Sequence, residues 1–461
     1  MRYISTRGQA PAQDFAQILL AGLAGDGGLF MPESWPQFSR ADVERLANAD
    51  YAAAATEILS RFAGESFSHA ELKADVEAAY ADFDDARIVP LEPLGPELFL
   101  LELFHGPTLA FKDLALQVLG RLFARALAKR GGRATVVVAT SGDTGSAAIA
   151  ALGGLANIDV FVLHPHNRVS EVQRRQMTTS PHGNVHNIAL EGTFDDAQSL
   201  VKALFADTDF VRAQSLTAVN SINFARIAAQ TVYYFAAARL DAPPIFVVPT
   251  GNFGDIFAGE AASRMGVDIE KLVIATNSND ILARALNDGV YAAGSAKATL
   301  SPSMDIQVAS NFERALFEAS NRDSGWVRDA MNEFARERRI DLPMKVLSAL
   351  RDRYTAMSCN DAETLEAMAR VHREFGRLID PHTAVGMSAA FKFWKKTGAP
   401  ILVLSTAHPA KFPDAVRKAT GVTPPLPPHM ADLYDKRERM SVLPNDLAAI
   451  RGFIKDRVAH P

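Results

Sequence analysis

The sequence is poor in the residues that build disulfides and metal sites. Among its 461 residues Cys359 is the only cysteine, so no internal disulfide and no Cys-x-x-Cys metal site can form. Such cysteine usage is typical of a reducing compartment. His182 and His186 have the spacing of a metal-binding pair on a helix, but Pro181 and Gly183 predict a loop there, and no third ligand is evident.

The chain also lacks an excess of basic residues and any long apolar run. With 48 Lys and Arg against 53 Asp and Glu the net charge is −5, which excludes the basic footprint of a nucleic-acid-binding protein. No apolar segment of a signal peptide follows Met1, and no run reaches the roughly 18 apolar residues of a membrane span. The uncharged stretch 144–158 predicts a buried helix. We therefore expect a cytoplasmic enzyme.

Several common catalytic motifs are missing as well. There is no Gly-x-Ser-x-Gly sequence, which argues against a nucleophile-elbow hydrolase. The glycine-containing run 251–255 matches neither the P-loop nor the dinucleotide-binding fingerprint.

The chain divides into three segments with different sequence patterns. Residues 1–95 have the periodicity of helices over 41–59 and 68–83, and each helix starts with the spacing of a capping box, at Ser39 and at Ser68. Residues 96–420 alternate short β-branched runs with Ala-rich helices, and a smaller lobe is expected at roughly 130–230. Residues 421–461 begin with a Pro-rich stretch and form a tail, expected to be a stiff packed connector.

The alternating segment predicts an α/β fold. Its β-branched runs are apolar at most positions, as in parallel strands buried on both faces. Six such runs over this length indicate two sheets rather than one. They are residues 134–140, 159–163, 185–190, 245–250, 272–276 and 400–406.

Ligands of open α/β sheets bind beyond the carboxyl ends of the strands, so the residues that follow each strand are the candidates. Ser141 to Ser146 follow the first strand, and Gly251 to Asp255 follow the fourth. Glycines, hydroxyls and free N–H groups at a helix start form anion sites. Taken alone, each loop is also compatible with a capped turn without a ligand.

Two further positions carry chemically useful side chains. Lys112 lies near the start of a helix expected over 108–129, where the helix dipole and apolar neighbours would lower its pKa, as an imine-forming lysine requires. The alternative is a lysine that extends its amine into solvent. Asn220, Ser221 and Arg226 gather amide, hydroxyl and guanidinium donors within about two helical turns, either as an oxyanion site or as a capped helix with a surface arginine.

Together these signals resemble threonine synthase, a family within the fold type II pyridoxal-phosphate enzymes. The resemblance runs from residue 1 to about 420 and matches the longer bacterial and fungal branch. Its N-terminal part rests on residues 3–8 and 26–30. The other motifs are residues 105–113, 140–145, 249–255, 301–305, 380–384 and 405–412.

The resemblance implies the fold and the site. Two parallel-sheet, three-layer α/β domains of the tryptophan-synthase β-like type would follow an N-terminal helical domain. Lys112 would hold pyridoxal 5'-phosphate as a Schiff base, with Thr406, in preference to Ser405, at the pyridine nitrogen. Asp143 would lie beside the phenolic oxygen, with its protonation state open. The implied cofactor-phosphate loop is Gly251, Asn252, Phe253, Gly254 and Asp255, and the implied substrate contacts are Ser141, Thr144, Asn220, Ser221 and Arg226.

The implied reaction converts O-phospho-L-homoserine and water to L-threonine and phosphate. Lys112 would remove the α-proton, and Arg226 with its neighbours would stabilise the leaving phosphate. A serine/threonine dehydratase, which lacks a site for a second phosphate, is the alternative within the fold type. A lyase acting on O-phosphothreonine and a non-catalytic phosphometabolite binder are further alternatives. Relatives in this branch favour a monomer.

Overall fold

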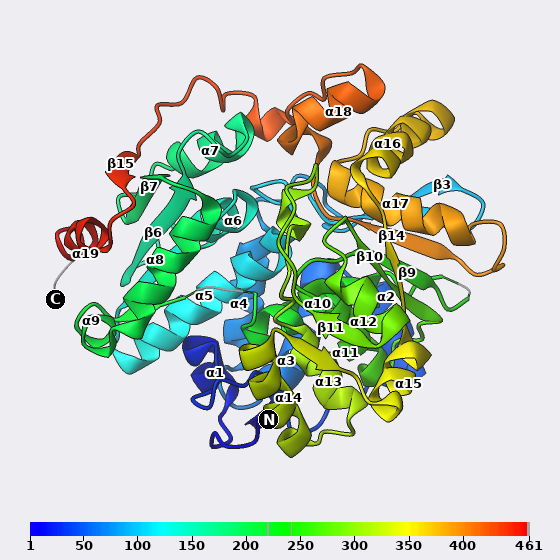
Figure 1. The fold of residues 1–461 in the computed structure, drawn as a ribbon, viewed down its shortest axis with the longest axis horizontal. Helices are drawn as coiled ribbons and strands as arrows, with labels where there is room; N and C mark the ends of the chain where they lie inside the picture. The colour runs from blue at the N-terminus through cyan, green and yellow to red at the C-terminus, as the bar shows by residue number, and fades with distance from the viewer. Residues whose placement is uncertain (219–220, 241, 459–461) are drawn as a thin grey trace.

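The computed structural model describes residues 1–218, 221–240 and 242–458, and it confirms an α/β fold built on two parallel sheets. Each sheet is the centre of a lobe, and the two lobes lie side by side (Figure 1). The N-terminal region, blue in the figure, lies along one side of both lobes.

The large lobe contains a six-stranded sheet of order β13-β10-β9-β14-β4-β3. All neighbours are parallel except β3 and β4, which form an antiparallel edge. The strands are β3 (Leu91–Gly95), β4 (Leu98–Glu102), β9 (Ile245–Pro249), β10 (Lys271–Thr276), β13 (Tyr354–Ser358) and β14 (Ile401–Ser405).

Helices cover both faces of this sheet because its strands alternate apolar side chains to either side. One face packs on α16 (Asp361–Phe375), α17 (Pro381–Phe393) and α18 (Pro413–Thr420). The other packs on α10 (Phe224–Ala236), α11 (Gly254–Met265), α12 (Ile281–Asp288), α13 (Phe312–Ala319) and α15 (Met344–Arg353). Beside them lie α14 (Ser324–Glu337) and the antiparallel pair β11 (Val290–Ala292) and β12 (Arg339–Asp341).

The small lobe contains a five-stranded, all-parallel sheet of order β15-β7-β6-β5-β8. Its strands are β5 (Ala134–Ala139), β6 (Ile158–Pro165), β7 (Val185–Glu191), β8 (Leu216–Thr217) and β15 (Ser441–Pro444). One face packs on α5 (Lys112–Arg130), α6 (Asp143–Leu152) and α7 (Glu171–Thr178). The other packs on α8 (Phe194–Ala206), α9 (Thr208–Ala213) and α19 (Leu447–Lys455).

The N-terminal region has no core of its own. Its helices bury their apolar faces against α5 and α10, so that one continuous apolar cluster joins this region to both sheets. An ion pair from Arg7 to Glu313 of α13, 2.9 Å long, adds a polar tie. The elements are β1 (Tyr3–Ser5), α1 (Phe15–Ala21), β2 (Phe30–Pro32), α2 (Arg40–Ala47), α3 (Tyr51–Ala63) and α4 (His69–Tyr80).

The predicted capping boxes at Ser39 and Ser68 are both confirmed. The single helix expected over 41–59 is wrong, because the chain breaks between α2 and α3. There the carboxylate of Asp50 accepts a hydrogen bond of 3.1 Å from the N–H of Ala53 and so starts a new helix.

All six predicted strands form, each within two residues of its expected bounds. The helix expected from 108 begins at Lys112. The buried helix expected over 144–158 is α6, which ends at Leu152. Among the helices of the described residues, none is both long and apolar enough to cross a membrane.

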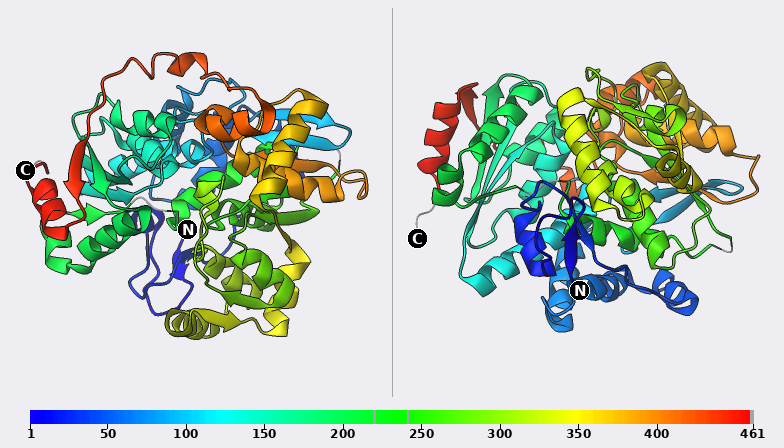
Figure 2. Two further views of the ribbon diagram at one scale, coloured as in Figure 1. Left: turned by 45° about the horizontal axis from the view of Figure 1, so that its top comes forward. Right: turned by 60° about the horizontal axis from the view of Figure 1, so that its bottom comes forward.

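The tail is joined to the small lobe. It leaves α18, passes over α7 through the short 3₁₀ helix η3 (Pro428–Met430), and ends as β15 and α19 at the outer edge (Figure 2). In α19, Ile450 and Ile454 are fully buried against Phe161 of the sheet and its neighbours. The tail is thus an integral part of this lobe's core.

Replacing Ile450 by Ala should therefore destabilise the small lobe. A buried Ile-to-Ala change removes transfer free energy and leaves a cavity, at a cost of about 2–5 kcal/mol. The measurement is the thermal unfolding of both proteins by calorimetry. Val442→Ala is the matched control, since Val442 is 45% exposed on the adjoining strand. Equal melting of the two variants would contradict the assigned role of the tail.

Candidate active site

Loops from both lobes meet at one place. Asp143 begins α6 after β5 of the small sheet, whereas Lys411 ends the 3₁₀ helix η2 (Pro409–Lys411) after β14 of the large sheet. Their side chains form an ion pair of 2.8 Å. The short 3₁₀ helix η1 (Pro302–Met304) joins them, since the Ser303 hydroxyl donates to Asp143 over 2.8 Å. This is the edge at which α/β sheets bind ligands.

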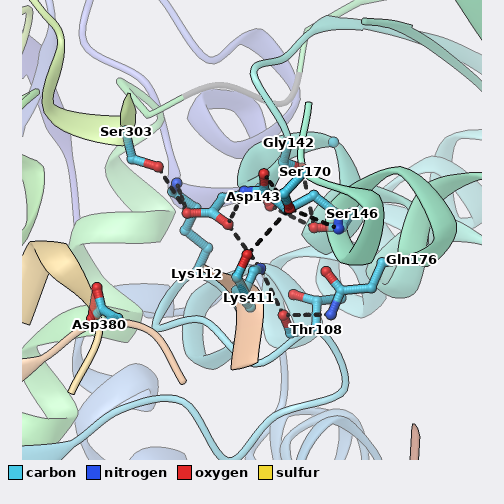
Figure 3. A network of polar contacts seen from close by, with 12 residues as sticks. Thr108, Lys112, Gly142, Asp143, Ser146, Ser170, Gln176, Ser303, Asp380 and Lys411 are labelled. Carbon is cyan, nitrogen blue, oxygen red and sulfur yellow. Dashed lines mark hydrogen bonds and ion pairs between the residues drawn. The ribbon is translucent and has the colours of Figure 1, made fainter. Parts of the chain in front are cut away.

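Lys112 is the first residue of α5, with its side chain directed into this junction (Figure 3). The preceding backbone is fixed against the end of β14, since Phe111 N–H donates to Thr406 C=O over 2.9 Å. The Lys112 Nζ atom lies 3.3 Å from the Asp143 carboxylate. Burial lowers the pKa of Lys112, as do the nearby cations Lys411 and Arg226, and Asp143 opposes them. The geometry thus favours a reactive amine rather than one that extends into solvent.

The Asp143 carboxylate is the centre of the network in Figure 3. Besides the two lysines, Gln173 Nε2 donates to it over 3.0 Å. Burial alone would raise the pKa of Asp143, but the adjacent cations, Lys411 first and then Lys112, hold it well below the usual range. The carboxylate is therefore ionised and accepts hydrogen bonds.

The 251–255 loop leads into α11, whose N-terminus has no side-chain cap. Phe253 has a left-handed backbone (φ 66°), unusual for a bulky residue, and its buried ring packs on Phe312 and Tyr354 with centroids 5.2 and 5.3 Å away. In the described part of the chain, nothing accepts from the N–H groups of Gly254 and Asp255. Such free donors at a helix N-terminus are a candidate anion site.

The Asp255 side chain does not face that anion site. Its Oδ1 accepts hydrogen bonds from the hydroxyls of Tyr233 and Tyr234 on α10. Burial raises its pKa to about 7. Only the backbone of Asp255 is therefore available to an anion at α11.

Asn252 connects this loop to the second candidate cluster. Its Nδ2 donates to Ser221 Oγ, and its backbone C=O accepts from Asn311 Nδ2 over 3.1 Å. Ser221 is thus next to the 251–255 loop. Asn220 lies outside the described residues.

Arg226 is buried in the first turn of α10, only 4% exposed. Within the described ranges, no hydrogen bond or ion pair holds its guanidinium, and burial lowers its pKa to about 10. It contributes to the field at Lys112 and at Asp255. A buried guanidinium without a partner is costly, so its position indicates an anionic ligand. The alternative of a surface arginine is wrong.

The two hydroxyls at the end of β14 point into different surroundings. Ser405 Oγ lies 3.1 Å from Thr383 Oγ1, which donates to Asp380 over 2.6 Å, so Ser405 belongs to a buried relay under α17. Thr406 is buried next to Phe111, and no described residue bonds to its hydroxyl. Thr406 therefore has the free hydroxyl.

The start of α6 offers a second set of free donors. Gly142 has a φ of 139°, and Thr140 Oγ1 accepts from the N–H groups of Gly142 and Gly145 over 2.9 Å each. Among the described residues nothing accepts from the N–H of Thr144. Ser141 and Thr144 are half-buried, so their hydroxyls flank this helix N-terminus.

Three members of the network have no role predicted from the sequence: Lys411, Gln173 and Ser303. Lys411 and Ser303 lie inside motifs that were identified, but the local sequence does not show that their side chains reach Asp143. Gln173 lies in α7, and nothing in its local sequence marks it.

Comparisons with known proteins bear on this geometry. Family models described as "Threonine synthase N terminus", "Pyridoxal-phosphate dependent enzyme" and "Threonine synthase, C-terminal" match residues 2–80, 85–342 and 383–454. A threonine synthase from Pseudomonas aeruginosa is 49% identical, and the alignment covers 98% of each chain. The chain belongs to the threonine synthase family.

Solved structures of this family agree with the fold. A PLP-bound threonine synthase from Brucella melitensis superposes with a TM-score of 0.97 at 48% identity over 100% of both chains. Threonine synthase from yeast gives 0.94 at 37% identity over 99% of this chain and 98% of the other. The resemblance found in the sequence is thereby confirmed.

The residues present in this threonine synthase family member fit pyridoxal phosphate. An amine for the aldehyde is present at Lys112, and free N–H donors for a phosphate are present at α11. At Gly251 the loop backbone passes close to residues 303 and 304, because a Cβ there would lie 3.1 Å from Ser303 C=O and 3.2 Å from Met304 Cα. A side chain at this position would close the space beside the loop.

Lys112→Ala should abolish the visible absorption of the cofactor-loaded protein, because the amine that binds the aldehyde is lost. In the unsubstituted protein, borohydride should fix the cofactor to the peptide that contains Lys112, as mass spectrometry can show. Lys129→Ala, at the exposed far end of the same helix, is the control. Cofactor fixed to another peptide would contradict the assignment.

Gly254→Val should weaken cofactor retention. A Cβ at Gly254 would lie 3.3 Å from Nδ2 of the fully buried Asn311, and a β-branched side chain would crowd the helix N-terminus. The cofactor content after dialysis is the measurement. Gly183→Val is the control, since nothing lies within 4 Å of an added Cβ there. Full occupancy in Gly254→Val would place the phosphate elsewhere.

Proposed function

We propose that this chain is a threonine synthase, which converts O-phospho-L-homoserine and water to L-threonine and phosphate with pyridoxal 5'-phosphate, as the last step of threonine biosynthesis. The observation that carries the proposal is the buried guanidinium of Arg226, which no described residue pairs with, within electrostatic reach of the Lys112 amine. A dehydratase has no use for a second buried cation of this kind, whereas a substrate that itself carries a phosphate requires one.

Chain residues would hold the cofactor on three sides. Lys112 binds the aldehyde, the N–H groups of the 251–255 loop bind the phosphate, and Thr406 meets the pyridine nitrogen. The engagement of Ser405 with Thr383 supports Thr406 for that role. When bound, the cofactor supplies an electron sink that stabilises negative charge at the substrate's α-carbon.

Lys112 moves the proton. The lowered pKa of its amine favours the neutral base, so that Nζ accepts the proton from the substrate's α-carbon. The ionised Asp143 lies beside it and stabilises the ammonium that forms. The Thr406 hydroxyl, unlike a carboxylate, would not stabilise a proton on the pyridine nitrogen, and so would moderate the electron sink.

Arg226 binds the substrate phosphate and stabilises the charge that develops as this group leaves. Ser221, fixed by Asn252, adds a hydroxyl, and we include Asn220 in the same cluster from the sequence. Ser141 and Thr144 at the start of α6 bind the substrate carboxylate, because free N–H donors and hydroxyls meet there. Each anionic group of the substrate thus has its own set of donors.

Water must be excluded before elimination and admitted after it. The contacts of Asp143 with Ser303 and Lys411 join the two lobes next to Lys112. We expect the lobes to close by tightening these contacts and to open for product release.

The organisation that we propose has a threonine-synthase-type domain at 1–95, a two-lobed catalytic region at 96–420 with the smaller lobe at roughly 130–230, and a tail at 421–461. The protein would act in the cytoplasm on a small molecule, as a monomer, without nucleic acid or membrane.

Arg226→Ala should lower kcat/KM by at least ~10²-fold, because a charged donor to a leaving phosphate is worth a few kcal/mol. Cofactor absorption should not change, since Arg226 acts on the substrate. Arg226→Lys should rescue activity only in part, because a point charge cannot reproduce a bidentate fork. Paired assays of phosphate and threonine are the measurement, and both products should fall together. Arg239→Ala, at an exposed position beyond the end of α10, is the control.

Other outcomes identify the alternatives. Loss of cofactor absorption in Arg226→Ala would assign this residue to the cofactor. Unchanged activity in Arg226→Ala would place the substrate phosphate elsewhere, and a dehydratase without a second phosphate site would regain ground. Formation of 2-oxobutyrate from O-phosphothreonine, without threonine from O-phospho-L-homoserine, would identify the related lyase.

A further inference from the structure

Lys411 is a fully buried lysine to which the proposed reaction gives no step. Its side chain is 0% exposed. Its Nζ donates to Thr108 C=O over 2.7 Å and pairs with Asp143 Oδ1 at 2.8 Å. Burying an ammonium costs desolvation free energy. A buried lysine therefore indicates that either its function or a specific fold offsets this cost.

Lys411 and Lys112 share one carboxylate from opposite sides (Figure 3). Asp143 Oδ1 receives Lys411 and Gln173, and Asp143 Oδ2 receives Lys112 and Ser303. Each oxygen thus has one cation and one neutral donor. The distance to Lys411, 2.8 Å, is shorter than the 3.3 Å to Lys112, so the carboxylate is committed mainly to Lys411.

This sharing changes the electrostatics at Lys112. A carboxylate paired with Lys112 alone would strongly favour the charged ammonium. The positive charge of Lys411 offsets much of the attraction between Asp143 and the Lys112 ammonium, because Lys411 repels that ammonium. Arg226 of α10 is the other charged group that lowers the pKa of Lys112, and burial lowers it as well. His382 of α17 faces Asp143, and Asp113 of α5 is turned away to Thr108, whose hydroxyl donates to it over 2.7 Å.

We propose that Lys411 is a positioning residue that fixes and neutralises the Asp143 carboxylate, so that Lys112 is presented to cofactor and substrate as a free amine instead of a strongly paired ammonium. The inference rests on the proposed function for its purpose, since that reaction needs Lys112 first as a nucleophile and then as a base. Lys411 itself touches neither reacting group, but acts through Asp143.

A purely structural role is the competing explanation. Lys411 also holds Thr108 C=O, and its own C=O accepts from Ser170 Oγ over 3.2 Å at the start of α7. A structural tie would affect stability without altering the titration of Lys112. The titration of Lys112 therefore separates the two explanations.

The experiment uses the full chain freed of cofactor. Brief pulses of acetic anhydride at a series of pH values label neutral amines, and mass spectrometry measures labelling of Lys112 against the exposed Lys73. In Lys411→Met the labelling midpoint of Lys112 should rise by about 1 pH unit, because a nearby like charge is removed. In Lys411→Arg, which keeps the charge, the midpoint should stay near that of the unsubstituted chain.

A midpoint in folded Lys411→Met that is unchanged or lower overturns the proposal. If Lys411→Met does not fold, as circular dichroism reports, Lys411→Gln provides the same test, because it is neutral and keeps hydrogen-bond donors for Asp143 and Thr108. The labelling uses no substrate. An unchanged labelling midpoint therefore does not bear on threonine synthesis, which has its own assay. Conversely, a negative result in the threonine assay does not alter a measured shift of the Lys112 midpoint.

Discussion

Positive charge is concentrated in the interior of this protein, and the architecture of the site follows from the need to balance it. Lys112 and Lys411 are largely buried around the Asp143 carboxylate, and Arg226 is buried near Lys112 with no ion pair among the described residues. In a medium of low polarisability such an imbalance is unfavourable unless anions arrive. A cofactor phosphate and a substrate phosphate are such anions. The interior therefore carries an excess of positive charge that such anions would neutralise.

The fold supplies this arrangement by using two sheets instead of one. Loops after β5, β9 and β14 converge from separate lobes, and the long helices α5 and α10 lie between them in one continuous apolar core. The same two helices carry Lys112 and Arg226 in their first turns. Because the N-terminal region packs on both helices, it fixes the relative placement of the two cations without contributing a side chain to the chemistry.

Among the eleven described strands of the two large sheets, six could be predicted, because strands buried on both faces form recognisable apolar runs. The antiparallel pair β3 and β4, the two-residue β8 and the partly exposed β15 could not be predicted. β13 (Tyr354–Ser358) could not be predicted either, since polar residues interrupt it and it follows α15 without a turn signal. The break at Asn48 was hidden by an apolar pattern that continues from α2 into α3. In the site, the loops and Lys112 have local signatures. The role of Lys411 has none, because it depends on a carboxylate that only the tertiary fold brings within reach.

The position of β15 has a consequence for synthesis on the ribosome. Strands β5 to β8 emerge early, yet β7 remains an edge strand until residues 441–444 pair with it, after the whole large lobe has been made. An unpaired edge of a parallel sheet is a template for association with other chains. The nascent small lobe therefore has an unpaired edge strand until residues 441–444 have been synthesised. Premature termination anywhere in the large lobe leaves that edge strand unpaired.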